Sequence, residues 1–388
     1  MDLLKSISLP PLLPGTSLLA WRNLSHERSR FIITLVGIVF SVVLMGVQLG
    51  LLIGFCLTTS GIIDNTDADI WITPAGTSNV DIASRQATRW RQQALALPEV
   101  ASADHFLMQF SLWRKPAGGS EGVMLVGFNL ASQRGGPWNI VEGHIEDLQT
   151  DGAVMLDRLY AKKLGASHVG QTIEINSQRV RIVGFTQGVR TFTQTPYVFT
   201  TYRNAQKIGR IPNDETSYVL IKLKENTDLA NVVATLRKRL PNVDVWSRDE
   251  WSTRTRMYWM LTTGAGAALL IAGALGLVVG IVIVGQTLYA STVDRLPEYA
   301  TLRAMGAPNR YLYTVILKQA LLSAVLGFIF GIFITMSASW FSQQGNVLIE
   351  VPWWAILIII LLTILMCLAG ATASIRRVLV LDPSSVFK

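Results

Sequence analysis

Four long apolar runs dominate the pattern of hydrophobic and polar positions along this chain. The first covers residues 31–57 without a charged side chain, and the others cover residues 258–288, 311–340 and 351–374. About 20 apolar residues are enough for a helix to cross a hydrocarbon core about 30 Å thick. We therefore predict four transmembrane helices. The arginines before the first run and its length favour an uncleaved anchor over a signal peptide.

The segment between the first two runs, residues 58–257, has the pattern of a folded domain. Strand-like alternation occurs at residues 69–72, 124–128 and 217–222, and helical spacing at residues 230–240 precedes a short strand at residues 243–246. This order of strands and helices predicts an inserted α+β domain.

The middle of that segment, about residues 143–202, differs from its two ends. Short strands at residues 172–175 and 180–185 are separated by residues typical of turns, namely Gly165, Gly170, Asn176 and Gly184. This pattern predicts a β-rich insertion within the α+β domain.

The distribution of charge predicts the orientation of the spans. Of the lysines and arginines, 11 lie outside residues 58–257 against 6 acidic residues, whereas 23 basic and 20 acidic residues lie inside. The outer basic residues flank the runs, and the loop of residues 341–350 has none, so the positive-inside rule places both termini and residues 289–310 in the cytoplasm. The net charge of +8 is therefore a topology signal, and no nucleic-acid partner is expected.

These observations predict a multi-pass membrane protein with a large extracytoplasmic domain. Its expected parts are a cytoplasmic N-terminus (1–30) with an interfacial helix, spans at 31–57, 258–288, 311–340 and 351–374, an extracytoplasmic domain (58–257), a cytoplasmic loop (289–310), a short extracytoplasmic loop (341–350) and a cytoplasmic tail (375–388). The interfacial helix is expected around Leu18, Leu19, Trp21 and Leu24, whose apolar side chains share one face.

No residue pattern indicates catalysis or metal binding. The two cysteines, Cys56 and Cys367, lie in apolar runs, and the four histidines are scattered. Residues 165–172 imitate a phosphate-binding loop, but Gln171 stands where a lysine must reach the phosphates, so a turn into a strand is the better interpretation. We expect no catalytic residue, no cofactor and no metal in this chain.

Small residues recur at four-residue spacing in three of the runs. Such spacing lets helix backbones approach closely, either within one bundle or at a dimer seam. The glycines concerned are Gly46, Gly50, Gly54, Gly276, Gly280, Gly327 and Gly331.

A few polar side chains interrupt the apolar runs. Gln48 and Gln286 are expected to hydrogen-bond between helices, with a path for cargo as the alternative. Lys318, beside Gln319, is expected to extend toward the cytoplasmic face or to bond between helices.

The loop between the second and third runs carries the signals of a short helix. Pro297 suits its first turn, Glu298 and Arg303 complement its dipole, and Gly306 suits its cap before Pro308. Tyr299, Leu302 and Met305 give this helix an apolar surface that fits a groove on a partner. The predicted docking helix consists of Pro297, Glu298, Tyr299, Ala300, Thr301, Leu302, Arg303, Ala304, Met305 and Gly306. The alternative is a solvated helix that only connects two spans.

This loop and several other segments resemble permeases of the FtsX/MacB-type superfamily. Within that superfamily, the chain is most similar to the DevC-like group. The matching segments are residues 21–24 (Trp-Arg-Asn-Leu), 27–30, 42–45, 48–50, 67–70, 296–306, 365–367, 382–383 and 386–387. The resemblance covers essentially the whole chain but thins in the inserted domain.

The resemblance implies a permease subunit of an ABC exporter that works by mechanotransmission. It also implies a bacterial inner membrane as the location, with the inserted domain and the loop of residues 341–350 in the periplasm. It implies a separate cytoplasmic ATPase that binds the ATP and Mg, a second permease copy, a HlyD-like periplasmic adaptor and a TolC-like outer-membrane channel. The cargo would be lipid-like or amphipathic. Two alternatives share this architecture, namely a non-transporting regulator of a cell-wall hydrolase and a lipoprotein-releasing permease.

Overall fold

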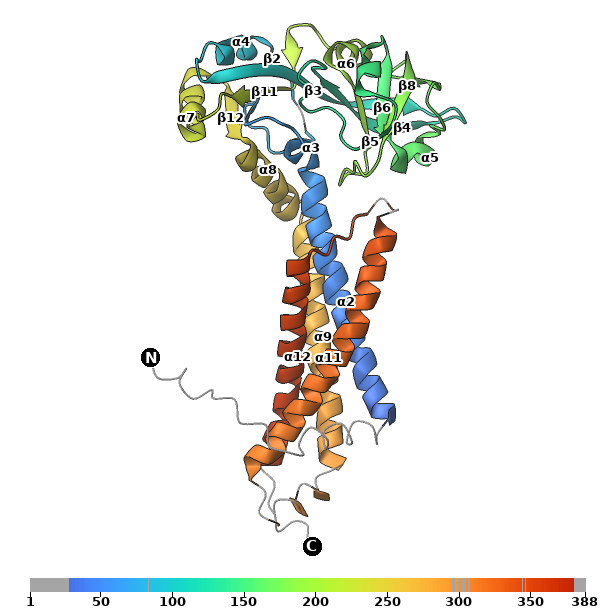
Figure 1. The fold of residues 1–388 in the computed structure, drawn as a ribbon, viewed down its shortest axis with the longest axis vertical. Helices are drawn as coiled ribbons and strands as arrows, with labels where there is room; N and C mark the ends of the chain where they lie inside the picture. Colours follow the sequence, from blue (N-terminus) through green and yellow to red (C-terminus); the bar gives the residue numbers. More distant parts are fainter. Residues whose placement is uncertain are drawn as a thin grey trace. The chain divides into compact units, whose positions relative to one another are not determined.

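The computed structural model describes residues 28–82, 84–294, 297–298, 300–301, 305, 308–343, 345 and 347–379. The chain folds into two compact units, labelled by element in Figure 1. The first, here called the helix bundle, comprises Met1–Ile53, Ala268–Phe341 and Ile349–Lys388. The second, here called the inserted domain, comprises Gly54–Ala267 and Ser342–Leu348.

Four long helices form the bundle: α2 (Arg28–Thr59), α9 (Ala265–Asp294), α11 (Asn309–Ser342) and α12 (Trp353–Leu379). Among the described residues, these four are long and apolar enough to cross a membrane. They pack around the buried side chains of Ile38, Val42, Val284, Ile316 and Ile359. The predicted number of spans is confirmed.

The second membrane helix begins later than residue 258, where the sequence pattern placed it. Tyr258–Thr262 form a single π-helical turn after α8 (Arg248–Met257), and Gly264 adopts a φ of 73°. Glycine takes this left-handed conformation readily, and it ends the helix, so α9 starts at Ala265. The long helices also run past the predicted spans, to Asp294, Ser342 and Leu379, because hydropathy marks apolar stretches rather than hydrogen-bonded ones.

One end of the inserted domain is a four-stranded sheet with two helices. The strands β1 (Ile70–Pro74), β3 (Val100–Arg114), β11 (Tyr218–Leu223) and β12 (Val243–Ser247) pair antiparallel in the order β12-β1-β11-β3. Helix α4 (Arg89–Leu95) joins β1 to β3, and α7 (Leu229–Arg239) joins β11 to β12. This is the split β-α-β order of ferredoxin-like folds, so we call this part the ferredoxin-like lobe.

The other end is a closed barrel, here called the barrel lobe. It contains β4 (Ser120–Phe128), β6 (Ala153–Asp157), β7 (Thr172–Ile175), β8 (Gln178–Thr186) and β9 (Tyr197–Thr201). The pairing runs β3-β4-β9-β6-β8, and β7 pairs with both β8 and β3, which closes the ring. Side chains such as Trp113, Leu125 and Ile182 fill its interior. Closure leaves no free sheet edge in this ring.

Strand β3 belongs to both lobes. Its first half pairs with β11, and its second half, from Leu107 to Arg114, pairs with β4. The predicted β-rich insertion therefore supplies only part of the barrel, since β3 and β4 precede residue 143.

The turn predicted at Gly184 is wrong, because this residue lies inside β8. The pairing of β6 with β8 shifts register there, from Val154 opposite Ile182 to Met155 opposite Gly184. A Cβ atom on Gly184 would lie 2.5 Å from the carbonyl oxygen of Glu142 in the neighbouring strand β5 (Ile140–Glu142). Glycine is required by this close approach at a bulge and not by a turn.

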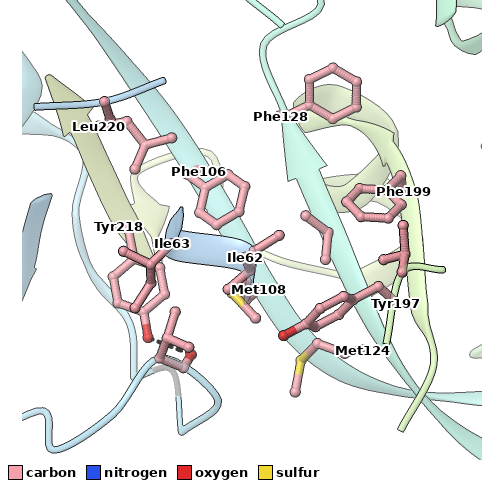
Figure 2. Packing of buried hydrophobic residues seen from close by; sticks show 14 of the residues in the cluster. Ile62, Ile63, Phe106, Met108, Met124, Phe128, Tyr197, Phe199, Tyr218 and Leu220 are labelled. Atoms are coloured by element: carbon pink, nitrogen blue, oxygen red, sulfur yellow. Dashed lines mark hydrogen bonds between the residues drawn. The ribbon is translucent and has the colours of Figure 1, made fainter. Parts of the chain in front are cut away.

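A short helix, α3 (Gly61–Asp64), completes the core between the two lobes. Figure 2 shows Ile62 and Ile63 of this helix among the side chains of Phe106, Met108 and Tyr218. The remaining elements are β2 (Gln86–Ala87), β10 (Glu215–Thr216), α5 (Ala161–Leu164), α6 (Tyr202–Gly209) and the 3-10 turns Ile145–Gln149 and Arg158–Tyr160.

Candidate functional site

The described part of the predicted docking helix is helical. Pro297, Glu298, Ala300 and Thr301 have helical backbone. The hydroxyl of Thr301 donates to the carbonyl of Pro297 at 2.8 Å, and the amide of Met305 donates to the carbonyl of Thr301 at 3.0 Å. Met305 is 71% exposed. An apolar side chain is thus available to a partner at the end of this segment.

The rest of that predicted helix lies outside the described residues. These positions are Tyr299, Leu302, Arg303, Ala304 and Gly306. The interfacial helix predicted around Leu18, Leu19, Trp21 and Leu24 also lies outside them.

The glycines at four-residue spacing in the long helices face other segments of the same chain. A Cβ on Gly46 would lie 2.8 Å from Thr335, on Gly327 2.2 Å from Ile38, and on Gly331 2.5 Å from Val42. The other members meet the following neighbours: Gly50 meets Ile349 and Val351, Gly54 meets Leu348, Gly276 meets Leu44, and Gly280 meets Met366 and Ser41. Gly285 and Gly370, which the spacing did not single out, also face each other. These contacts favour packing within one bundle over a dimer seam.

An apolar groove of about 180 Å³ lies within the bundle between α2, α9 and α12. Its lining includes Met45, Leu277 and Ile359, and its one polar side chain is Gln48. The Oε1 atom of Gln48 is buried and has no hydrogen-bond partner within the described part of the chain. Gln286, by contrast, is exposed, and Gln319 is buried. The interhelical hydrogen bond expected for Oε1 of Gln48 is therefore not formed among the described residues.

The loop that imitates a phosphate-binding loop is a closed turn. Gly165 caps α5 in the left-handed conformation, with a φ of 68°. The side chain of Gln171 donates to the carbonyl of Gly165 at 2.9 Å and accepts from the amide of Ser167 at 2.7 Å. Strand β7 then begins at Thr172. Gln171 thus holds the turn together.

No constellation suited to a metal ion occurs in the described ranges, where three or more His, Cys, Asp or Glu side chains never cluster. Cys56 and Cys367 form no disulfide with each other, and Cys367 is buried. These observations add nothing that points to chemistry in this chain.

The two chain segments that enter and leave the inserted domain are braced by one polar cluster. The guanidinium of Arg256 in α8 donates to the hydroxyl of Ser60 at 2.7 Å and to the carboxylate of Asp64 at 2.6 Å. Ser252 donates to the other oxygen of Asp64 at 2.7 Å. Charge-assisted bonds of this kind are stronger than neutral ones, so α3 and α8 are held together.

A second contact region, which the sequence did not reveal, lies at the loop between β8 and β9, residues 187–196. Phe192 in this loop contacts Phe55 near the end of α2 and Trp259 in the π-helical turn. Trp259 donates its indole N–H to the carboxylate of Asp81 at 3.1 Å. Arg190 donates to backbone carbonyls of the segment between α11 and α12. These residues come from five distant parts of the sequence.

Two carboxyl groups support this region, the half-buried Asp81 and the buried Asp157. Desolvation raises the pKa of Asp81 to about 6. The hydrogen bonds from Trp259 and Tyr197 lower this pKa, but the effect of desolvation is larger. Burial likewise raises the pKa of Asp157, which accepts bonds from the amide of Val189 at 2.7 Å and the hydroxyl of Thr186 at 3.0 Å. Asp157 thereby fixes the start of the loop.

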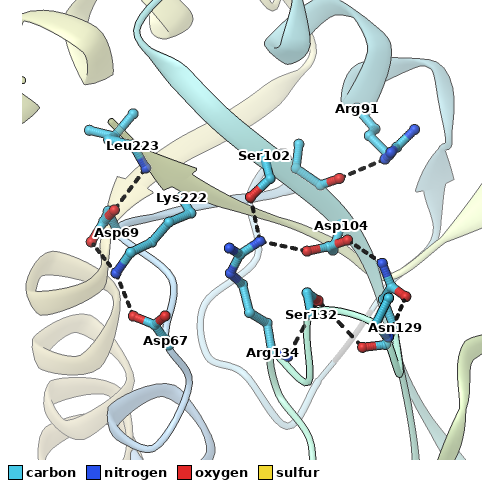
Figure 3. Close-up of polar contacts among 12 residues, drawn as sticks. Asp67, Asp69, Arg91, Ser102, Asp104, Asn129, Ser132, Arg134, Lys222 and Leu223 are labelled. Carbon is cyan, nitrogen blue, oxygen red and sulfur yellow. Dashed lines mark hydrogen bonds and ion pairs between the residues drawn. The ribbon is translucent and has the colours of Figure 1, made fainter. Parts of the chain in front are cut away.

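Polar contacts on the ferredoxin-like lobe serve the fold (Figure 3). Arg134 donates to Asp104 at 2.7 Å and to Ser102 at 2.6 Å, and Asn129 donates to the second oxygen of Asp104 at 2.5 Å. The Arg134 and Asp104 side chains are only 14% and 6% exposed. They hold the loop after β4 against β3.

Two family sequence profiles account for nearly the whole chain. The MacB-like periplasmic core domain matches residues 31–239, and the FtsX-like permease C-terminal domain matches residues 253–383. The chain is also similar to the uncharacterized ABC transporter permease Rv0072 of Mycobacterium tuberculosis (strain ATCC 25618 / H37Rv), with 22% identity over 378 residues, 95% of this chain and 98% of the relative.

The chain is also similar to a second permease and to one solved structure. The uncharacterized ABC transporter permease Mb2592 of Mycobacterium bovis (strain ATCC BAA-935 / AF2122/97) is 24% identical over 379 residues, covering 95% of this chain and 98% of its own. The periplasmic region of MacB from Actinobacillus actinomycetemcomitans superposes with a TM-score of 0.38 and 13% identity over 49% of this chain and 94% of that one. The family profiles carry the assignment, because the first alone spans more than half of the sequence. The chain therefore belongs to the FtsX/MacB family of ABC transporter permeases, with a MacB-like periplasmic core domain inserted before an FtsX-like permease domain.

Proposed function

We propose that this permease is the membrane subunit of an exporter in which ATP hydrolysis by a partner moves the extracytoplasmic domain. An ABC transporter permease works with an ATPase, and the segment from Pro297 to Met305 is its proposed docking helix. The observation that carries this proposal is the helical backbone at Pro297, Glu298, Ala300 and Thr301, followed by the exposed side chain of Met305. A short helix with one apolar side is suited to a groove on a partner.

The proposed orientation places this docking helix and both chain termini in the cytoplasm. Arginines lie around the docking helix, and the loop of residues 341–350 contains none. The positive-inside rule supports that arrangement. The inserted domain then lies in the periplasm, in keeping with its match to a periplasmic core domain.

The proposed cargo is a lipid-like or amphipathic molecule taken from the periplasm or from the outer leaflet of the inner membrane. The apolar groove between α2, α9 and α12 supports this class, since it offers an apolar lining and the Oε1 atom of Gln48, which has no hydrogen-bond partner among the residues that the structure describes. The proposed assembly contains two permease copies, a HlyD-like adaptor and a TolC-like channel.

Export is favoured over the regulatory alternative by the size of the inserted domain. It contains a complete ferredoxin-like lobe and a closed barrel that shares β3 with it. Regulators of this superfamily usually carry a smaller domain.

The test is ATP hydrolysis by the permease co-purified with the ATPase encoded beside it, in nanodiscs. The double variant Glu298→Lys, Leu302→Glu reverses one charge and places a second on the proposed apolar face, so we expect assembly or hydrolysis to be lost. The control makes the same two substitutions at exposed positions of the inserted domain, Glu225→Lys and Leu229→Glu, and should hydrolyse ATP like the wild type.

The wild-type chain must bind the ATPase for the proposal to stand. If it binds none, a membrane-anchored receptor or scaffold becomes the better account. If the docking-helix variant hydrolyses ATP as well as the control, the ATPase docks elsewhere.

A further inference from the structure

The loop between β8 and β9, residues 187–196, contacts three segments that continue directly into membrane helices. It meets the last turns of α2 through Phe55, the π-helical turn before α9 through Trp259, and the segment after α11 through Gln343 and Gly345. All these residues lie within the unit defined above as the inserted domain. One loop of the barrel lobe thus touches the ends of several membrane-crossing segments.

Arg190 holds the segment after α11 through its backbone. Its Nε donates to the carbonyl of Gly345 at 3.3 Å, and its Nη2 donates to the carbonyl of Gln343. A guanidinium presents its donors in a fixed planar fork, so two carbonyls held at once fix the position of the segment better than one would.

Phe192 lies between two aromatic rings. Its ring centroid is 4.3 Å from that of Phe55, with an interplanar angle of 74°, and 5.3 Å from that of Trp259, with an angle of 61°. Edge-to-face contacts of this kind are attractive and depend on geometry. A shift of either neighbour therefore acts directly on Phe192.

The base of this loop is rigidly attached to the barrel. Asp157, at the end of β6, accepts from Thr186 and from the amide of Val189. The hydroxyl of Thr191 donates to the carbonyl of Thr195 at 3.0 Å, which closes the loop on itself, and Val189 is buried. A displacement at Arg190 or Phe192 is thus passed to β6 and β8 rather than absorbed.

The chain connections between the inserted domain and the membrane helices lie outside the barrel lobe. The chain enters the inserted domain through α3 into β1 and leaves it through β12 into α8, and both of these strands lie in the ferredoxin-like lobe. The barrel lobe is joined to that lobe through the shared strand β3. The β8–β9 loop is therefore a route to the barrel lobe that does not pass through β3.

We propose that the β8–β9 loop is the element that transmits displacement of the helix ends to the barrel lobe, with Arg190 and Phe192 as its positioning residues. This inference rests on the proposed function, because it assumes that ATP hydrolysis moves the membrane helices. In this mechanism, the loop rotates the barrel lobe about the shared strand β3. The ferredoxin-like lobe moves with the two chain segments, α3 and α8, that connect it to the membrane helices.

The experiment measures the distance between the two lobes in the full permease–ATPase complex in nanodiscs. Spin labels are attached at Lys162→Cys in α5 and Glu225→Cys after β11, two exposed positions, with Cys56→Ser and Cys367→Ala removing the native thiols. Double electron–electron resonance records the distance without nucleotide and with ATP and vanadate. We expect a nucleotide-dependent shift that is lost in Arg190→Ala and Phe192→Ala, while assembly and basal ATP hydrolysis remain.

Two further variants separate transmission from folding. Gln187→Ala changes an exposed side chain of the same loop and should keep the shift. Arg190→Lys keeps the charge without the fork, so part of the shift should return. The nucleotide-free distance must match the wild type in every variant, which shows that the lobes remain folded.

The outcomes distinguish this inference from the proposed function. A wild-type chain that binds no ATPase overturns the proposed function and this inference with it. An active complex in which ATP produces no change between the lobes, or in which Arg190→Ala and Phe192→Ala keep the full change, overturns the inference alone.

Discussion

The glycine contacts of the bundle make a quantitative prediction at Gly331. In α11, a Cβ at this position would lie 2.5 Å from Cγ1 and 2.6 Å from Cβ of Val42 in α2. Val42 is β-branched, and its Cβ cannot move by a rotamer change, so the helices must separate. Overpacking of this kind costs about 1–3 kcal/mol, and replacing glycine by alanine within a helix returns about 1 kcal/mol. With the cost near its upper end, Gly331→Ala should destabilise the bundle by about 2 kcal/mol.

The matched control is Gly273→Ala in α9. A Cβ there would lie 3.6 Å from the Cβ of Gln48, an ordinary contact, so this variant should be as stable as the wild type or slightly more stable. Both variants are unfolded by SDS titration in mixed micelles and followed by circular dichroism. Light scattering gives the mass of the assembly under native conditions.

The two readouts separate packing within one chain from a dimer seam. Lower stability of Gly331→Ala with an unchanged mass agrees with the contact to Val42. If instead Gly331→Ala unfolds like Gly273→Ala while its assembly dissociates, the reasoning from intrachain packing is refuted.

Two further predictions concern the inserted domain. Arg134→Ala leaves the Asp104 carboxylate buried without its cation and should lower the stability of the folded domain by about 3–5 kcal/mol. The double variant Arg134→Met, Asp104→Leu removes both charges and should cost much less. Hydrogen exchange of β3 peptides in the full chain measures both losses, and equal protection in the two variants would contradict the prediction. The pKa of Asp81, about 6 in the folded chain, exceeds its ordinary value, so the folded state binds this proton more tightly and stability should fall as pH rises from 4 to 6. The loss of stability should reach at most about 3 kcal/mol and disappear in Asp81→Asn. Thermal unfolding of the wild type and of Asp81→Asn between pH 4 and 7 checks this. If stability changes with pH in the same way in the two proteins, Asp81 is not the group responsible.

The sequence pattern predicted those features that depend on local composition. The four spans follow from apolar runs, and the strands around residues 69–72, 124–128 and 217–222 follow from alternation. Each of these signals lies within a few neighbouring residues, and the structure has helices and strands at all of them.

Barrel closure was not predictable in the same way. The pairing of β7 with the far end of β3 joins Trp113 to Ile175, and neither strand carries a mark of its partner. Gly184 was misplaced for a related reason, since the neighbour that excludes a side chain there is the carbonyl of Glu142 in another strand.

The candidate sites likewise differ in whether their signals are local in the sequence or come from distant residues. The docking helix was suggested by Pro297, Glu298 and Gly306, which act within one or two helical turns. The Arg190 contact joins residues 153 positions apart, and a lone arginine in a polar loop has no distinguishing pattern. The break before α9 was also missed, because Gly264 stands among small residues that read equally well as membrane helix.

The pairing of β1 with β12 has an evolutionary consequence. The first and last strands of the inserted domain are direct neighbours, with Trp71 opposite Trp246. A fold that begins and ends at one place can be grafted into a host chain as a module, because the graft does not change the separation of the flanking helices. The barrel, built from the middle of that module, is then free to diversify among relatives while the membrane segments are retained.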